Sequence, residues 1–100
     1  MLYVTLKDRD EASRIGKDLV QNRLSACVNI IENSLSIYQW KGKICEDTEV
    51  ILLAKTKSTL LQEAIKKIKT LHSYECPCIV SLPITGGFSP FLDWIKTQTR

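Results

Sequence analysis

An unbroken apolar run from Val50 to Ala54 places the strongest constraint on how this chain folds. The five residues are typical of a strand, but they do not alternate with polar residues, so both faces of that strand need cover. The chain has 100 residues, of which 44% are hydrophobic, and this fits one folded domain. We therefore expect a single domain over residues 1–100, with helices on one sheet face and another copy of the chain on the other.

The residues before this run predict a strand followed by an amphipathic helix. Leu2–Leu6 alternates between apolar and β-prone polar positions, which is typical of a strand. Asp8 and Glu11 have the spacing of an N-cap and its reciprocal partner, and apolar residues then recur at helical spacing. We expect this helix to end near Asn22.

A long hairpin is predicted next. The β-rich run from Ala26 to Ile31 resumes its alternation from Leu35 to Trp40, which indicates one bent or bulged strand. Lys41-Gly42-Lys43 supplies a flexible turn, and the chain returns through Ile44 and Cys45 to Lys55.

The remainder predicts a helix, a strand and a terminal helix. Ser58 or Thr59 has the residue type of an N-cap for a helix ending around His72, and a strand over Cys78–Leu82 precedes a helix over Phe88–Thr99. The resulting order βαββαβ with an added helix predicts an α+β, ferredoxin-like fold.

Charge and composition predict a soluble, cytoplasmic protein. The net charge of +3 is spread along the chain, and no apolar stretch reaches the length of a membrane span. No secretion signal is visible, so the four cysteines are expected to be reduced thiols. Nucleic-acid and membrane partners are not expected.

Several activities of ferredoxin-like domains do not fit the sequence. The residues after the first strand lack a glycine-rich anion loop, and the third strand lacks the aromatic residues of an RNA-recognition domain. No nucleophile and base can be assigned, so we expect no enzymatic activity and no required cofactor.

Cys76 and Cys78 are the most suggestive local pair. Residues two apart in an extended segment point to the same side, and thiolates prefer soft ions such as Cu(I). The alternative is that both thiols fill space at the start of a core strand.

His72, the only histidine, also has two interpretations. Histidine is a common metal ligand, and three copies would meet only in a trimer. At the C-terminal end of a helix, an imidazolium is also favoured by the helix dipole, which is a purely structural reason for its presence.

Taken together, the ordered motifs of this chain resemble the CutA1 family of divalent-cation tolerance proteins. The resemblance extends over nearly the whole chain, and the segments that carry it are Ala26–Ile30, Tyr38–Ile44, Glu49 with Lys55 and Thr56, His72–Pro77, and Trp94 with Ile95.

The resemblance implies a homotrimer, similar in architecture to the PII signalling proteins, that binds copper(II) or another divalent cation. Carried over by position, the implied ligands are Cys27 and His72. The chain departs from the family pattern at Leu71, where some members have a second His, and at Ser73 and Cys78, where a Pro and a Glu are typical. Cys78, with Cys76, favours softer ions.

The second hypothesis is a PII-like structural or signalling trimer that binds a small molecule or partner protein in clefts between subunits. Lys55, Tyr74 and Glu75 are the predicted cleft-lining residues, because each lies at the end of an expected element.

Overall fold

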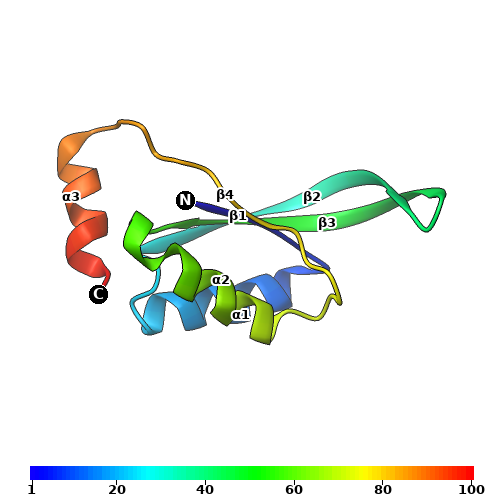
Figure 1. The fold of residues 1–100 in the computed structure, drawn as a ribbon, viewed down its shortest axis with the longest axis horizontal. Helices are drawn as coiled ribbons and strands as arrows, with labels where there is room; N and C mark the ends of the chain where they lie inside the picture. The colour runs from blue at the N-terminus through cyan, green and yellow to red at the C-terminus, as the bar shows by residue number, and fades with distance from the viewer.

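The computed structural model describes residues 1–100 as a four-stranded antiparallel sheet with α1 and α2 on one face and α3 beyond one end (Figure 1). The sheet order is β2-β3-β1-β4, so β3 lies between the parallel strands β1 and β2. This is the split βαβ arrangement expected from the sequence, and the ferredoxin-like prediction is confirmed. The elements are β1 Leu2–Leu6, α1 Arg9–Gln21, β2 Cys27–Trp40, β3 Lys43–Lys55, the 3-10 turn η1 Ser58–Leu60, α2 Leu61–Leu71, β4 Ile79–Ser81 and α3 Ser89–Gln98.

Helix α1 begins at the predicted cap, but one half of the predicted capping pair is wrong. The Asp8 carboxylate accepts a hydrogen bond from the Glu11 amide at 2.8 Å, as a cap should. The Glu11 side chain does not return this bond. It is buried and accepts from the Ser73 amide instead, because the chain leaving α2 passes this end of α1.

The β2-β3 hairpin forms around a two-residue turn. Lys41 and Gly42 have φ angles of 50° and 78°, and two consecutive positive φ values are typical of a type I′ turn between twisted strands. The predicted bulge is present, since the pairing register shifts between Ile31 and Ser34. The hairpin extends well beyond the helices, and the molecule is 45 Å long as a result (Figure 1).

The predicted cap of the next helix is wrong. Residues Ser58–Leu60 wind into η1, so α2 begins at Leu61 and neither Ser58 nor Thr59 caps it. Strand β4 and helix α3 are slightly shorter than predicted. Hydrogen bonds from the Thr5 amide to the Cys78 carbonyl and from the Leu82 amide to the Met1 carbonyl still extend the β1-β4 pairing at both ends.

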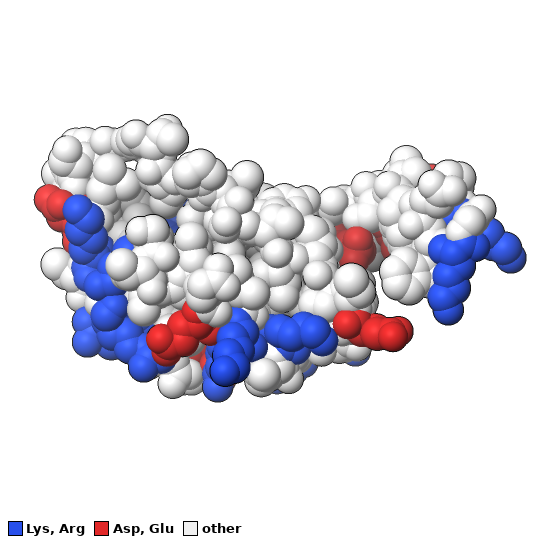
Figure 2. Space-filling view, in the orientation of Figure 1, with Lys and Arg blue, Asp and Glu red and all other residues white.

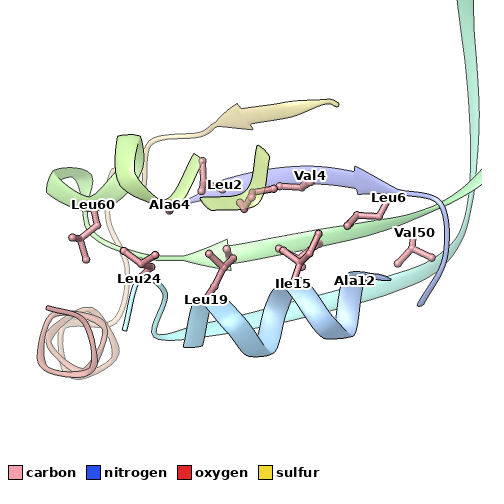
Figure 3. Packing of buried hydrophobic residues seen from close by; sticks show 13 residues of the cluster. Leu2, Val4, Leu6, Ala12, Ile15, Leu19, Leu24, Val50, Leu60 and Ala64 are labelled. Atoms are coloured by element: carbon pink, nitrogen blue, oxygen red, sulfur yellow. The ribbon is translucent and has the colours of Figure 1, made fainter. Parts of the chain in front are cut away.

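The core lies between the sheet and helices α1 and α2. Leu2, Val4 and Leu6 of β1 lie in this core together with Ile15 and Leu19 of α1 and Ala64 of α2 (Figure 3). Gly16 allows the close approach of α1 to β2, because a Cβ atom there would lie 2.8 Å from Cγ2 of Val28. The helices therefore cover one face of the sheet over β1 and the inner part of the hairpin, and the outer part of the hairpin extends beyond them.

The opposite face of β3 is only half covered. Val50, Leu52 and Ala54 are buried against the helices, whereas Ile51 and Leu53 on the other face are half-buried. The helices thus cover one face of the Val50–Ala54 strand, as expected from the sequence, and the cover expected from another copy on the second face stays a prediction. None of the helices has both the length and the apolar character that crossing a membrane requires.

Candidate metal-binding cleft

A cleft of about 690 Å³ lies on the sheet face opposite α1 and α2, at the base of the projecting hairpin. Its walls are the cleft-facing side chains of β1, β2 and β3 and the segment 73–78, which leads from α2 to β4. The lining residues are Tyr3, Thr5, Ser36, Tyr38, Trp40, Asp47, Glu49, Ser73, Tyr74, Glu75, Cys76 and Cys78.

The charge of this cleft is opposite to that of the chain. Three carboxylates line it, those of Asp47, Glu49 and Glu75, and no lysine or arginine does. Figure 2 shows acidic atoms where the surface is hollowed beside the hairpin, while most basic side chains lie on the helix side and at the hairpin tip. In a chain of net charge +3, this is a local environment that attracts cations.

Strand register explains why the hairpin residues meet in the cleft. Directly paired residues of antiparallel strands share a face, and Ser36 pairs with Asp47 while Ser34 pairs with Glu49. The two-residue turn sets this register, and the bulge after Ile31 joins it to the inner pairing, in which Ile31 is opposite Ile51.

Two tyrosines hold two of the carboxylates. The Tyr74 hydroxyl donates to Oε2 of Glu49 at 2.8 Å, and the Tyr38 hydroxyl donates to Oδ2 of Asp47. The hydrogen bond to Asp47, followed by loss of solvent, raises the pKa of Tyr38 to about 12. Burial, followed by the hydrogen bond to Glu49, raises the pKa of Tyr74 well above its usual value of 10. Glu75 makes no such bond and is exposed to solvent.

The segment after α2 is fixed by three consecutive residues. Nε2 of His72 donates to the Thr5 carbonyl at 2.8 Å, and its Nδ1 accepts from the Tyr74 amide at 3.1 Å. The Ser73 amide donates to Oε2 of Glu11 at 3.0 Å. These contacts require a neutral imidazole that carries its proton on Nε2. His72 therefore supports the wall of the cleft from behind.

Glu11 is the most buried carboxylate of the chain, with 2% of its surface exposed. Its Oε1 has no hydrogen-bond partner, and the nearest cation is the Arg14 guanidinium, 4.0 Å from Oε2. An acceptor at this position is needed for the Ser73 amide. The sequence offered only the capping interpretation of Glu11, because the path of the chain after α2 was not visible.

The residues predicted from the sequence are divided between two regions. Tyr74, Glu75, Cys76 and Cys78 line the cleft. Cys27 pairs with Lys55 at the other end of the sheet, and both lie outside the cleft.

Cys27 and His72 do not meet within one chain. His72 contacts Thr5, which pairs with Ile51, and Ile51 lies four residues from Lys55 along β3, roughly 13 Å away. No three His, Cys, Asp or Glu side chains lie close enough to hold a metal ion. A ligand role for Cys27 and His72 stays a prediction.

Asp47, Glu49 and Tyr38 were missed from the sequence. Counting outward from the Lys41-Gly42 turn would have found them, because that turn fixes which hairpin residues are paired.

The Tyr74–Glu49 contact predicts a pH-dependent stability. The unfolded chain loses the Tyr74 proton near pH 10, whereas the folded chain retains it to higher pH. The stabilisation is therefore complete below about pH 10 and is lost as pH rises toward the folded-state pKa. In urea denaturation between about pH 9.5 and 11, we expect the free energy of unfolding to fall more steeply for the wild type than for Tyr74→Phe. Parallel slopes would contradict this role.

Comparison with known proteins gives matches over nearly the whole chain. The family model described as "CutA1 divalent ion tolerance protein" matches residues 1–98. The "Divalent-cation tolerance protein CutA" of Thermus thermophilus is 40% identical over 99 residues, which are 99% of this chain and 96% of that protein. "Protein CutA, chloroplastic" of Arabidopsis thaliana is 38% identical over 100 residues, and the chain spans 55% of its length. The chain thus spans about half the length of the plant relatives.

Solved structures similar to this chain are also named CutA1. The divalent cation tolerance protein (Cut A1) of Thermus thermophilus has a TM-score of 0.96 at 40% identity, with 99% of this chain and 96% of that chain covered. CutA1 of Oryza sativa has a TM-score of 0.96 at 36% identity, with 99% and 91% covered. Similar proteins include a chloroplastic one from Arabidopsis thaliana and a periplasmic one from Archaeoglobus fulgidus, and the cytoplasmic location expected for this chain stays a prediction.

Proposed function

The chain belongs to the CutA1 family of divalent ion tolerance proteins, and from this premise we propose that it is a non-enzymatic homotrimer that binds copper or another heavy-metal divalent cation. The observation that carries the proposal is the cleft, which three carboxylates and two thiols line without any basic side chain. Similar proteins are named for tolerance of divalent cations, and none of those described above is named as an enzyme.

The cleft favours weak and selective binding of cations. Asp47 and Glu49 are already held by tyrosine hydroxyls, so each carboxylate has a fixed position and a second oxygen free to approach an ion. Carboxylate oxygens and thiolates are ligands for divalent transition metals. Since three ligands do not converge within one chain, water or a neighbouring subunit completes the coordination.

The homotrimer is supported by the apolar surfaces that one chain leaves open. Leu35, Ile37 and Ile44 of the hairpin are 62–73% exposed, and they lie on the helix side of the sheet beyond the reach of the helices. Ile51 and Leu53 on the other sheet face are half-buried. Exposed apolar side chains that cluster on one element are typical of protein interfaces, and a symmetric homo-oligomer covers them with its own copies.

Titration calorimetry with Cu²⁺, and with Zn²⁺ as a redox-inert divalent ion, tests where the cation binds. We expect Glu75→Gln to weaken binding at least about 10-fold, because the variant removes the one cleft carboxylate without a hydrogen-bond partner while preserving its shape. Glu46→Gln is the matched control, since Glu46 lies on β3 but faces away from the cleft. Equal losses in both variants, or none in either, would place the cation elsewhere.

The same titration tests the ligands carried over by resemblance. Cys27→Ser and His72→Ala each remove one predicted ligand, and neither side chain lines the cleft. Binding that is indistinguishable from that of the wild type in both variants would remove these residues from the metal site.

A second candidate function is a PII-like trimer that binds an anionic small molecule. The supporting observation is a second cleft of about 480 Å³ beside η1 and α3, lined by Lys57 and Lys96 and by no carboxylate. A thermal-shift screen separates the two functions: stabilisation by an anionic metabolite, but not by metal ions, would favour the second.

A further inference from the structure

Cys76 and Cys78 form a pair of exposed thiols on one wall of the acidic cleft. They belong to the segment that His72, Ser73 and Tyr74 fix to three different elements. The backbone that carries the two thiols therefore follows directly after residues that are hydrogen-bonded to β1, α1 and β3.

The backbone places both thiols on the same side. The Thr5 amide donates to the Cys78 carbonyl at 3.3 Å, so Cys78 continues the β1-β4 pairing in which Val80 is opposite Tyr3. Cys78 therefore faces the cleft beside Thr5. Pro77 restricts the residue before it to an extended conformation, and Cys76 faces the cleft as well.

The spacing suits one ion between two sulfur atoms. Residues two apart in an extended chain have Cα atoms roughly 6–7 Å apart. Metal–thiolate bonds of about 2.3 Å place two opposed sulfur atoms about 4.6 Å apart, which two cysteine side chains on such a backbone can reach.

The number of soft ligands selects the kind of ion. No third cysteine and no histidine lines the cleft. A tetrahedral zinc site takes four nitrogen or sulfur ligands, so this pair alone is a poor zinc site. Thiolates favour Cu(I), and two of them are sufficient for an ion of low coordination number.

We infer that Cys76 and Cys78 form a two-thiolate site for a soft monovalent cation of the Cu(I) class. The inference rests on the proposed function, in which the same cleft binds divalent cations, and it adds a second class of cation to that cleft. Binding replaces two S–H bonds with two metal–sulfur bonds and releases two protons to solvent, without transfer of electrons. The carboxylates of Asp47, Glu49 and Glu75 attract the cation, and no lysine or arginine lines the cleft to repel it.

The test is a competition for Cu(I) between the protein and the chromophoric chelator bicinchoninate, under nitrogen with ascorbate. We expect the wild type to bind one Cu(I) per chain through two sulfur atoms by X-ray absorption. Cys76→Ser and Cys78→Ser should each lose at least about 100-fold in affinity, since loss of a direct ligand costs more than loss of an outer contact. Cys45→Ser is the matched control, because it removes a half-buried thiol of β3 that does not line the cleft.

The outcomes separate this inference from the proposed function. Equal Cu(I) affinity in the wild type, Cys76→Ser and Cys78→Ser overturns the two-thiolate site, even if the wild type binds Zn²⁺. Loss of affinity confined to the two cleft variants supports the site. Failure of the wild type to bind any divalent cation would instead overturn the proposed function and leave the Cu(I) result standing.

Discussion

Replacing Ile37 with lysine is expected to convert the proposed trimer into a monomer of 11.4 kDa. Ile37 is 64% exposed on the projecting hairpin, and another subunit is required to bury it. Burial of one isoleucine side chain contributes about 1.5–3 kcal/mol, and the substitution removes this contribution from each subunit while placing a charge at the interface. Sedimentation velocity at micromolar concentration measures the change directly.

Lysine is chosen because it leaves the isolated chain intact. Ile37 pairs directly with Glu46 on β3, so a lysine there faces an opposite charge within its own hairpin. Val20→Lys is the matched control, since Val20 is an exposed apolar residue on α1, away from the hairpin. A trimer that survives Ile37→Lys would exclude this part of the hairpin from the interface, and a monomeric wild type would exclude the trimer.

Local signals explain which parts of the fold could be predicted. Asp8 caps α1 through a contact three residues away, and the Lys41-Gly42 turn determines the hairpin from its own backbone conformation. The cap and the turn each depend only on residues that are close in the sequence, so both can be predicted from it. The start of α2 was mispredicted, because η1 competes with a side-chain cap and nothing in the local sequence decides between them.

The candidate site was harder to predict because its parts come from distant segments. Cys76 and Cys78 were predicted as a pair and Glu75 as a cleft-lining residue, whereas no local pattern assigned Asp47 or Glu49 to a site. They join the cleft only through the register of the hairpin and the path of residues 72–78. Glu11 shows the same limitation, since its partner Ser73 is 62 residues away in the sequence.

His72→Ala is expected to lower the free energy of unfolding by about 2–4 kcal/mol. The imidazole is 9% exposed and uses both nitrogens, one for the Thr5 carbonyl and one for the Tyr74 amide. Alanine leaves a cavity and two polar groups without their partner. Urea denaturation at one fixed protein concentration measures the loss, because the stability of an oligomer depends on concentration.

His72→Gln separates the two roles that the sequence left open for this residue. A glutamine amide nitrogen can donate to the Thr5 carbonyl, as Nε2 does, but it cannot replace Nδ1 as the acceptor for the Tyr74 amide. We therefore expect an intermediate loss of stability, together with Zn²⁺ affinity close to that of the wild type. Nearly normal stability in both variants, combined with a loss of Zn²⁺ binding in both, would instead identify His72 as a ligand. Replacing a purely structural histidine would lower the free energy of unfolding without a selective loss of Zn²⁺ affinity.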